Sequence, residues 1–441
     1  MSLERLLVQG GNTLKGNVTI NGAKNSALVL MAAALLGTQD IIILDNVPRL
    51  ADIEIMAEVL QSLGAKATFT SHHTLEVDSR GLNASKAPYD LVTQMRASFF
   101  VLGPLVARMG RAEVALPGGC AIGSRPVDIH LKGLEAMGAR IEIEHGNVIV
   151  ETEGPLQGAD ITLSFPSVGA TENLMMAACL AEGKTALRNV AREPEIEDLA
   201  NFLNAMGAQI SGAGSDVIHI EGVKALKQPI RYPVMPDRIE AGTFMVAAAI
   251  TEGDVIVEKA PVAAMDSLIA TLREANVTID VIDHETLRVQ GNKPIRPVNI
   301  RTMPHPGFPT DMQAQMAVLL AVAEGTSSIT ETVFENRFMY VDEMLRMGSH
   351  MRVDGRTVTI VGEQELSGAP VQGTDLRAAA ALVLAGLIAE GETSVSNLHY
   401  LDRGYENFEH KLAGLGANIC RVTVQAEKAE EVSGSNSLVL C

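Results

Sequence analysis

Two patterns of apolar and polar positions recur along the chain at a nearly constant interval. In the first, an amphipathic helical segment ends at a glycine and leads into a short strand, as in LEAMGARIEI at 134–143. In the second, an Ala- and Leu-rich helical segment ends near a glycine and leads into a β-branched strand, as in CLAEGKTALRNV at 179–190. Glycine is favoured just beyond a helix because it adopts the left-handed conformation at little cost.

Both patterns give the same repeat. The first has Gly at 64, 138, 207, 348 and 416 and Asn at 276, with spacings of 74, 69, 69, 72 and 68 residues. The second has Gly at 37, 110, 183, 253, 325 and 391, with spacings of 73, 73, 70, 72 and 66. Because independent landmarks agree, the sequence predicts six copies of one α/β unit of βαβαββ-like order.

A chain of 441 residues is too long for one ordinary core, so we expect two α/β domains of three units each. The proline-rich stretch 227–236 marks the boundary, giving a first domain of residues 22–235. Residues 1–21 resemble the strand pair at 281–300 in pattern, so we expect them to complete a second domain with residues 236–424. The tail 425–441 has the composition of a disordered segment.

Composition excludes several classes of protein. The formal net charge of −18 argues against non-specific nucleic-acid binding, which needs a basic surface. No apolar run reaches the roughly 18–20 residues of a membrane span and no leader pattern is present, so we expect a cytoplasmic protein without a membrane partner. The four Cys form no CxxC pair and no phosphate-loop or dinucleotide fingerprint occurs, so we expect neither a metal nor a cofactor.

Unusual polar residues precede the first helix of each unit. Helix N-termini carry free N–H groups and partial positive charge, so they are ready anion sites. Capping explains Thr171 and Asp237 at least as well as ligand binding does. It does not explain a cation at this position, which is electrostatically unfavourable unless an anion offsets it. The basic residues at equivalent positions therefore predict a site for phosphate-bearing substrates in the cleft between the domains: Lys24, Arg96, Arg238 and Arg377.

The segment LPGGCAIGSRPVD at 116–128 places Cys120 in a glycine-rich loop. An exposed thiol near Arg125 is expected to have a lowered pKa and to serve proton transfer or nucleophilic chemistry. The alternative is an ordinary buried cysteine, which is what we expect of Cys179. His130 is as readily structural as functional.

Taken together, the motifs resemble those of the UDP-N-acetylglucosamine 1-carboxyvinyltransferases, a family of enolpyruvyl transferases, over residues 1–424. They include GAKN (22–25), LPGGCAIGSRPVD (116–128), SVGAT (167–171), FPTDMQAQ (308–315) and DRGYE (402–406). The resemblance implies two inside-out α/β domains of three repeats each. It also implies transfer of the enolpyruvyl group of phosphoenolpyruvate to the 3-hydroxyl of UDP-N-acetylglucosamine with release of phosphate, the first committed step of peptidoglycan synthesis. No metal is required for this reaction.

The resemblance also assigns roles to residues. Cys120 matches the general acid and the thiol that fosfomycin alkylates, and Asp311 matches the base near the sugar hydroxyl. Lys24 and Arg403 complete the catalytic set. Phosphoenolpyruvate contacts match Lys24, Asn25, Arg125 and Arg403. Sugar-nucleotide contacts match Arg96, Arg125, Pro126, Val127, Asp128, Ile129, Ser167, Val168, Gly169, Asp311 and Val333; Arg337 and Arg377 are further charge partners, and Glu193 and Glu195 match an acidic pair of open role.

Two alternatives stay open at this point. One is an enolpyruvyl transferase with another acceptor, such as shikimate 3-phosphate, against which the Cys120 loop argues. The other is a non-catalytic paralogue that binds UDP-sugars. The sequence departs from part of the family at Phe165-Pro166, where some members carry Lys-Val, so nucleotide affinity could differ. The oligomeric state is not predicted.

Overall fold

The computed structural model describes residues 3–116, 127–227, 229–363 and 365–424. The chain forms two compact units, each described here by itself. Unit 1 contains residues 1–19, 239–302 and 310–441, and unit 2 contains residues 20–238 and 303–309. Each unit is thus built from segments that are distant in the sequence.

Unit 2 begins with α1, the first of its buried helices. Its elements are α1 (Lys24–Ala33), η1 (Ala34–Leu36), β3 (Ile42–Asp45), α2 (Ala51–Ser62), β4 (Lys66–Phe69), β5 (Leu75–Asp78), α3 (Tyr89–Gln94), η2 (Arg96–Val101), α4 (Leu102–Met109), β6 (Arg111–Ala115), α5 (Asp128–Ala136), β7 (Arg140–Glu144), β8 (Asn147–Glu151), β9 (Asp160–Thr162), α6 (Val168–Ala178), β10 (Lys184–Arg188), α7 (Pro194–Ala205), β11 (Gln209–Ser211), β12 (Val217–Glu221) and β13 (Arg231–Pro233).

Unit 1 begins with two strands and resumes at α8, whose first residue is assigned to unit 2. Its elements are β1 (Leu3–Gln9), β2 (Lys15–Thr19), α8 (Arg238–Ile250), β14 (Asp254–Glu258), η3 (Val262–Ala264), α9 (Asp266–Glu274), β15 (Thr278–Asp283), β16 (Thr286–Gln290), β17 (Asn299–Arg301), η4 (Thr310–Met312), α10 (Gln313–Ala321), β18 (Thr326–Thr330), α11 (Tyr340–Arg346), β19 (His350–Asp354), β20 (Thr357–Val361), β21 (Pro370–Gln372), α12 (Leu376–Ile388), β22 (Glu392–Ser396), η5 (Leu401–Arg403), α13 (Phe408–Gly414) and β23 (Asn418–Val424).

The strands of the described residues form six small sheets, three in each unit, with one shared order. In the sheet β17-β18-β20-β19, the short strand β17 runs parallel to β18, and β18 pairs antiparallel with the hairpin of β19 and β20. Four other sheets repeat this order, and β6-β8-β7 lacks only the short parallel strand, whose place is taken by a parallel bridge of Lys86 to Glu113. The predicted six βαβαββ units are confirmed.

The two N-terminal strands complete the sheets of two βαβαββ repeats that lie far along the chain. Strand β1 lies between β22 and β23, with Leu6 opposite both Val395 and Arg421. Strand β2 supplies the short parallel strand beside β14. Unit 2 is inserted between β2 and α8, so the chain leaves unit 1 after its second strand and returns to it after residue 238.

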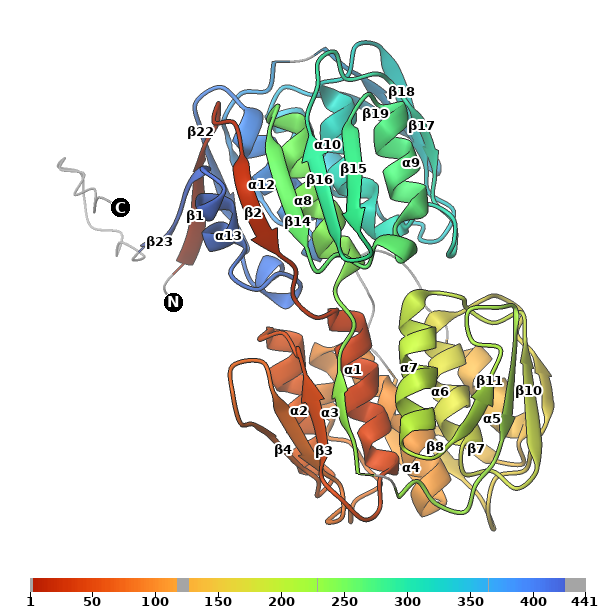
Figure 1. Cartoon of the computed structure of the whole chain (residues 1–441). Coiled ribbons are helices and arrows are strands. Elements are labelled where there is room, and N and C mark those ends of the chain that lie inside the picture. The colour runs from red at the N-terminus through yellow and green to blue at the C-terminus, as the bar shows by residue number, and fades with distance from the viewer. Residues whose placement is uncertain (1–2, 117–126, 228, 364, 425–441) are drawn as a thin grey trace. The chain divides into compact units, whose positions relative to one another are not determined.

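Five helices are apolar on nearly every side and are buried along most of their length: α1, α6, α8, α10 and α12. A helix without a polar face must be covered all round. The sheets provide the cover, because their strands alternate buried and exposed positions, as in β12 and β20. Figure 1 shows this arrangement within each unit, with helices in the middle and strands outside. Among the described residues no helix is both long enough and apolar enough to cross a membrane.

The glycine landmarks end helices in the predicted way. All six positions of the first landmark have positive φ: Gly64 (97°), Gly138 (91°), Gly207 (107°), Asn276 (74°), Gly348 (89°) and Gly416 (101°). The second landmark has positive φ at Gly110, Gly183, Gly325 and Gly391, but only Gly110 directly follows its helix, because α6, α10 and α12 end earlier, at Ala178, Ala321 and Ile388. At Gly37 and Gly253 the predicted positive φ is wrong. Helix α1 passes into the 3-10 turn η1 and reaches Gly37 with φ −66°. After α8, Glu252 adopts the left-handed conformation one residue before Gly253.

The landmark at Gly138 generates a stability prediction. A Cβ at this position would meet nothing within 4 Å, so the cost of a side chain is that of the backbone conformation alone. We expect Gly138→Ala to lower the free energy of unfolding by about 1–2 kcal/mol. Gly138→Asn should cost less, because Asn tolerates this conformation and stands at the same landmark in the fourth unit, at Asn276. Urea unfolding of the three proteins measures the difference; equal stability of the Ala and Asn variants would contradict it.

Candidate active site

The candidate residues that the structure describes are divided between the two units. Cys120, Arg125 and Pro126 lie outside the described residues. Unit 1 holds Asp311, Val333, Arg337, Arg377 and Arg403. Unit 2 holds Lys24, Asn25, Arg96, Val127, Asp128, Ile129, Ser167, Val168, Gly169, Glu193 and Glu195.

In unit 1 the carboxylate of Asp311 binds two guanidinium groups. Arg337 Nη2 donates to Asp311 Oδ1 at 2.7 Å, and Arg377 Nε and Nη2 donate to Oδ2 at 3.2 and 3.1 Å. The side chains of the two arginines are 6% and 4% exposed, whereas that of Asp311 is 26% exposed. The structure therefore presents a fixed, partly open carboxylate above two buried cations, which suits a base that must reach a bound substrate.

The start of each buried helix brings these side chains together. Asp311 lies in the 3-10 turn η4 that leads into α10, and Arg377 is in the first turn of α12, where Asp375 caps the helix by accepting from the N–H groups of Arg377 and Ala378. Helices α10 and α12 pack against each other. Arg403 is half-buried in η5, which packs against α12.

In unit 2 the ammonium group of Lys24 pairs with a carboxylate that the sequence did not indicate. Lys24 Nζ lies 2.8 Å from Asp52 Oδ2, with side-chain exposures of 12% and 3%. The first backbone N–H of α1, that of Lys24, donates to Asp237 Oδ2 at 3.4 Å. Asp237 thus caps α1. Asn25 is exposed beside this pair.

A second cluster in unit 2 surrounds His130. A Cβ on Gly169 would lie 3.3 Å from the His130 ring and 3.4 Å from the Phe100 ring, so a side chain there would require one of these rings to shift slightly. His130 packs edge-on against Phe99 and contacts Asn173. Burial, aided by the positive charge of Arg96, lowers the pKa of His130 to about 4, so the imidazole is neutral near pH 7 and has a structural role. Through this ring the structure brings the starts of η2, α5 and α6 together.

The three segments at this cluster carry most of the candidate sugar-nucleotide contacts. Arg96 begins η2, Asp128 begins α5 and is exposed, and Ser167 caps α6 by accepting from the N–H of Ala170 at 3.3 Å. Capping by Thr171 was wrong: its hydroxyl donates to the carbonyl of Ser167 and accepts from the N–H of Ala191. Thr171 therefore joins α6 to the segment before α7.

Glu193 and Glu195 belong to a buried acidic cluster that also contains Glu172. Glu195 pairs with Arg238 at 3.2 Å, and Glu193 accepts from the backbone N–H of His305 at 3.2 Å. Burial raises the pKa of Glu172 well above its usual value, and the charges of Glu195 and Glu193 raise it further. Burial likewise raises the pKa of Glu193. One oxygen each of Glu172 and Glu193 is buried without a hydrogen-bond partner.

Carboxylates of the protein itself pair with several of the cations at the helix starts. Lys24, Arg238 and Arg377 pair with Asp52, Glu195 and Asp311. An anionic ligand at these groups would therefore share or displace an existing partner. The arrangement can bind anions and provides a carboxylate for proton transfer, and its acid-base chemistry does not rely on His130.

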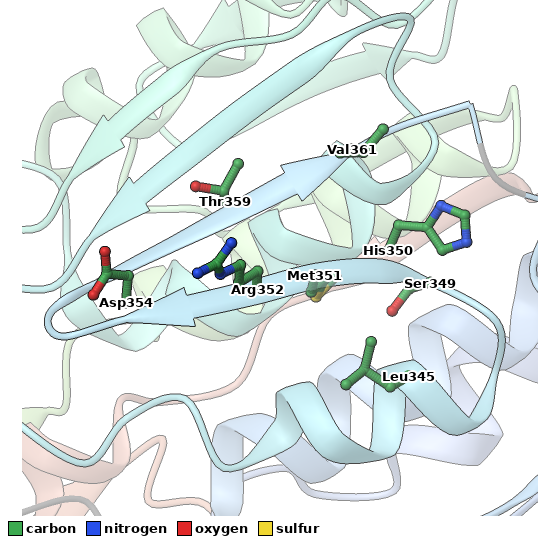
Figure 2. A pocket seen from close by; sticks show the side chains of 8 residues that line it. All are labelled: Leu345, Ser349, His350, Met351, Arg352, Asp354, Thr359 and Val361. Atoms are coloured by element: carbon green, nitrogen blue, oxygen red, sulfur yellow. The ribbon is translucent and has the colours of Figure 1, made fainter.

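A surface hollow elsewhere in unit 1 contains no candidate residue. Figure 2 shows it along the hairpin of β19 and β20, near the end of α11. Its lining residues are Leu345, Ser349, His350, Met351, Arg352, Asp354, Thr359 and Val361, and all of them except Ser349 and Met351 are exposed. The buried pairs of charged side chains described above, at Asp311 and Lys24, lie outside this hollow.

Several residues that shape the site were missed by sequence reasoning. Asp52 and Glu331 are single carboxylates in ordinary amphipathic surroundings, and no spacing marked them. Glu172 did carry a signal, because it is an isolated charge inside the apolar helical segment ATENLMMAA at 170–178. A charge is rarely buried without a specific reason.

Comparison with known proteins shows the family of the chain. Residues 8–412 match the family of EPSP synthase (3-phosphoshikimate 1-carboxyvinyltransferase). UDP-N-acetylglucosamine 1-carboxyvinyltransferase from Desulfatibacillum aliphaticivorans is 54% identical over 422 residues, covering 95% of this chain and all of the relative. UDP-N-acetylglucosamine 1-carboxyvinyltransferase 2 from Carboxydothermus hydrogenoformans is 54% identical over 427 residues, covering 96% and 100%.

Solved structures share the fold. The enolpyruvyl transferase NikO from Streptomyces tendae superimposes with a TM-score of 0.86 at 27% identity, covering 96% of this chain and all of that one. EPSP synthase from Acinetobacter baumannii gives a TM-score of 0.74 at 19% identity, covering 95% and 100%. The chain therefore belongs to the enolpyruvyl transferase family, and within it to the UDP-N-acetylglucosamine 1-carboxyvinyltransferases.

The buried acidic cluster generates a pH prediction. The pKa of Glu172 in the folded protein lies above its usual 4.5, so the stability that its neutral form contributes is lost as pH rises above that value. Glu172→Gln keeps the shape and cannot ionise. We expect its melting temperature to gain on that of the parent protein steadily between about pH 5 and pH 8.

The exposed position Glu197 on α7 provides the matched control for this measurement. Glu197→Gln removes a carboxylate outside the cluster and should show no such growing difference. A constant difference between Glu172→Gln and the parent across this pH range would contradict a buried, neutral Glu172.

Proposed function

We propose that the chain transfers the enolpyruvyl group of phosphoenolpyruvate to the 3-hydroxyl of UDP-N-acetylglucosamine and releases phosphate. The observation that carries the proposal is the 54% identity, over nearly the whole chain, to relatives named for this reaction. The paired Asp311 and the cations Lys24, Arg96, Arg377 and Arg403 supply the groups that such anionic substrates need.

In the proposed mechanism the Cys120 thiol donates a proton to C3 of phosphoenolpyruvate, which gives C2 cationic character. The sugar 3-hydroxyl adds to C2 and gives up its proton to Asp311, forming a tetrahedral intermediate that still carries phosphate. The Cys120 thiolate then takes back a proton from C3, and phosphate leaves with the proton held by Asp311, which yields the enolpyruvyl ether and restores both groups. Arg337 and Arg377 fix the Asp311 carboxylate for this step.

We assign each substrate to a set of the candidate residues named above. Lys24, Asn25, Arg125 and Arg403 are proposed to bind phosphoenolpyruvate. The sugar nucleotide is proposed to contact Arg96, the segment from Arg125 to Ile129, the segment Ser167 to Gly169, and Val333. We further propose that the reaction is cytoplasmic, serves peptidoglycan synthesis and thereby cell shape and division, and is blocked by fosfomycin at Cys120.

The acceptor is tested directly by phosphate release. The purified protein with phosphoenolpyruvate should release phosphate when UDP-N-acetylglucosamine is added, and neither without an acceptor nor with shikimate 3-phosphate. Shikimate 3-phosphate is the relevant comparison because the matching family is described by that reaction. Release only with shikimate 3-phosphate would establish the other acceptor, and binding of the UDP-sugar without turnover would establish a non-catalytic protein.

The role of Cys120 is tested by two substitutions. Cys120→Ala should lower kcat by about 10²–10⁴-fold, the usual contribution of a general acid. Cys120→Asp should retain part of the activity, since a carboxylic acid also donates a proton, but should resist fosfomycin.

Cys179→Ala is the control for these variants, because Cys179 is buried and burial raises its pKa to about 12, so it is not a reactive thiol. It should remain active and sensitive to fosfomycin. Full activity of Cys120→Ala, or inactivation of Cys120→Asp by fosfomycin, would remove Cys120 from its proposed role.

A further inference from the structure

The carboxylate of Glu331 joins three segments of unit 1. Glu331 follows β18 and is 0% exposed. Its Oε1 accepts from the hydroxyl of Thr302 at 2.8 Å and from the N–H groups of Val333 and Phe334 at 2.7 and 3.1 Å. Its Oε2 accepts from the hydroxyl of Thr310 at 2.8 Å. Four hydrogen bonds offset the cost of burying this charge.

Strand register explains why these segments meet at Glu331. Strands β17 and β18 are parallel, with Arg301 opposite Thr330. The next residues on the two strands are Thr302 and Glu331, and the N–H of Thr302 donates to the carbonyl of Thr330 at 3.0 Å. The carboxyl ends of parallel strands lie at one edge of a sheet, where α/β proteins place their ligand sites.

One of the four hydrogen bonds leads to Asp311. A hydroxyl has one proton, and that of Thr310 is used toward Glu331, so its oxygen accepts from Arg337 Nη1 at 3.1 Å. The same guanidinium donates through Nη2 to Asp311 Oδ1 at 2.7 Å. The orientation of the Thr310 hydroxyl, set by Glu331, therefore determines how Arg337 is held against the carboxylate.

We propose that Glu331 is a positioning residue for Asp311, acting through Thr310 and Arg337. The inference rests on the proposed function, in which Asp311 is the base. Glu331 itself does not touch substrate in this proposal. It keeps the acceptor side of the Thr310 hydroxyl toward Arg337 and at the same time fixes the backbone at Val333.

Glu331→Gln isolates this role. Three donors point at Oε1, so the amide oxygen must take that place and the amide nitrogen must replace Oε2. The amide nitrogen then donates to the Thr310 oxygen, so the Thr310 hydroxyl proton loses its acceptor on residue 331. The proton turns toward Arg337, whose guanidinium group has no acceptor for it. We expect kcat to fall about 10–100-fold, as for a small displacement of a catalytic group, with KM for UDP-N-acetylglucosamine within about threefold of the parent.

Two threonine variants separate positioning from folding. Thr302→Val and Thr310→Val each remove one hydroxyl bound to Glu331. Only the hydroxyl of Thr310 also contacts Arg337. Thr310→Val should therefore lower kcat as Glu331→Gln does, whereas Thr302→Val should lower the melting temperature but leave kcat within about threefold, because no reacting group depends on it.

The double variant Glu331→Gln with Thr310→Val completes the test. If Glu331 acts through Thr310, the kcat of the double variant should be no lower than that of the less active of the two single variants. Multiplied losses, parental kcat in Glu331→Gln, or equal kcat losses in Thr302→Val and Thr310→Val would overturn the proposal. If Glu331→Gln does not fold, the comparison of the two threonine variants decides.

The same assays keep the two proposals apart. A parent protein that releases no phosphate with UDP-N-acetylglucosamine refutes the proposed function and, with it, the role of Glu331. If the parent protein releases phosphate and Thr310→Val has the same kcat, only the positioning role is refuted.

Discussion

Helices that are apolar on every side have no surface on which to carry chemistry. In this protein such helices form the middle of each unit, where α10 is buried along all its residues and α12 nearly so. Polar function is therefore displaced to the ends of the helices and to the loops beside them. Asp311 and Arg377 lie at the beginnings of α10 and α12 for this reason, as Lys24 does at the beginning of α1.

Placing charge at the end of a buried helix creates a second requirement. A cation there lies close to partial positive charge and away from water, so it needs an anion. The structure meets this need with carboxylates of its own at Lys24, Arg238 and Arg377. If substrate phosphates and carboxylates bind to these groups, as the proposed function requires, each substrate anion competes with a carboxylate of the protein, and the affinity reflects the difference between the two interactions.

The parts of the fold that the sequence predicted are those set by local conformation. Gly138 and Asn276 mark helix ends because few residues tolerate positive φ, and that requirement is visible in one sequence. The sequence also placed Lys24 and Arg377 at helix starts, and because a cation there is unusual it predicted an anion site at these positions. Partners were not predictable, because Asp52 is 28 residues from Lys24 and Asp311 is 66 residues from Arg377, distances that no helical or strand period connects. Two contacts of Glu331, to the N–H groups of Val333 and Phe334, are local, whereas its contact with Thr302 exists only after β17 and β18 have paired.

The central place of β1 in the last sheet has a consequence for synthesis on the ribosome. Residues 20–238, nearly all of unit 2, are complete when little more than half of the chain has been made. Strand β1 is translated before its partners β22 and β23, which are among the last of the described strands. During that interval its backbone hydrogen-bonding groups have no native partner, so β1 stays open to non-native strand pairing until β23 has been made.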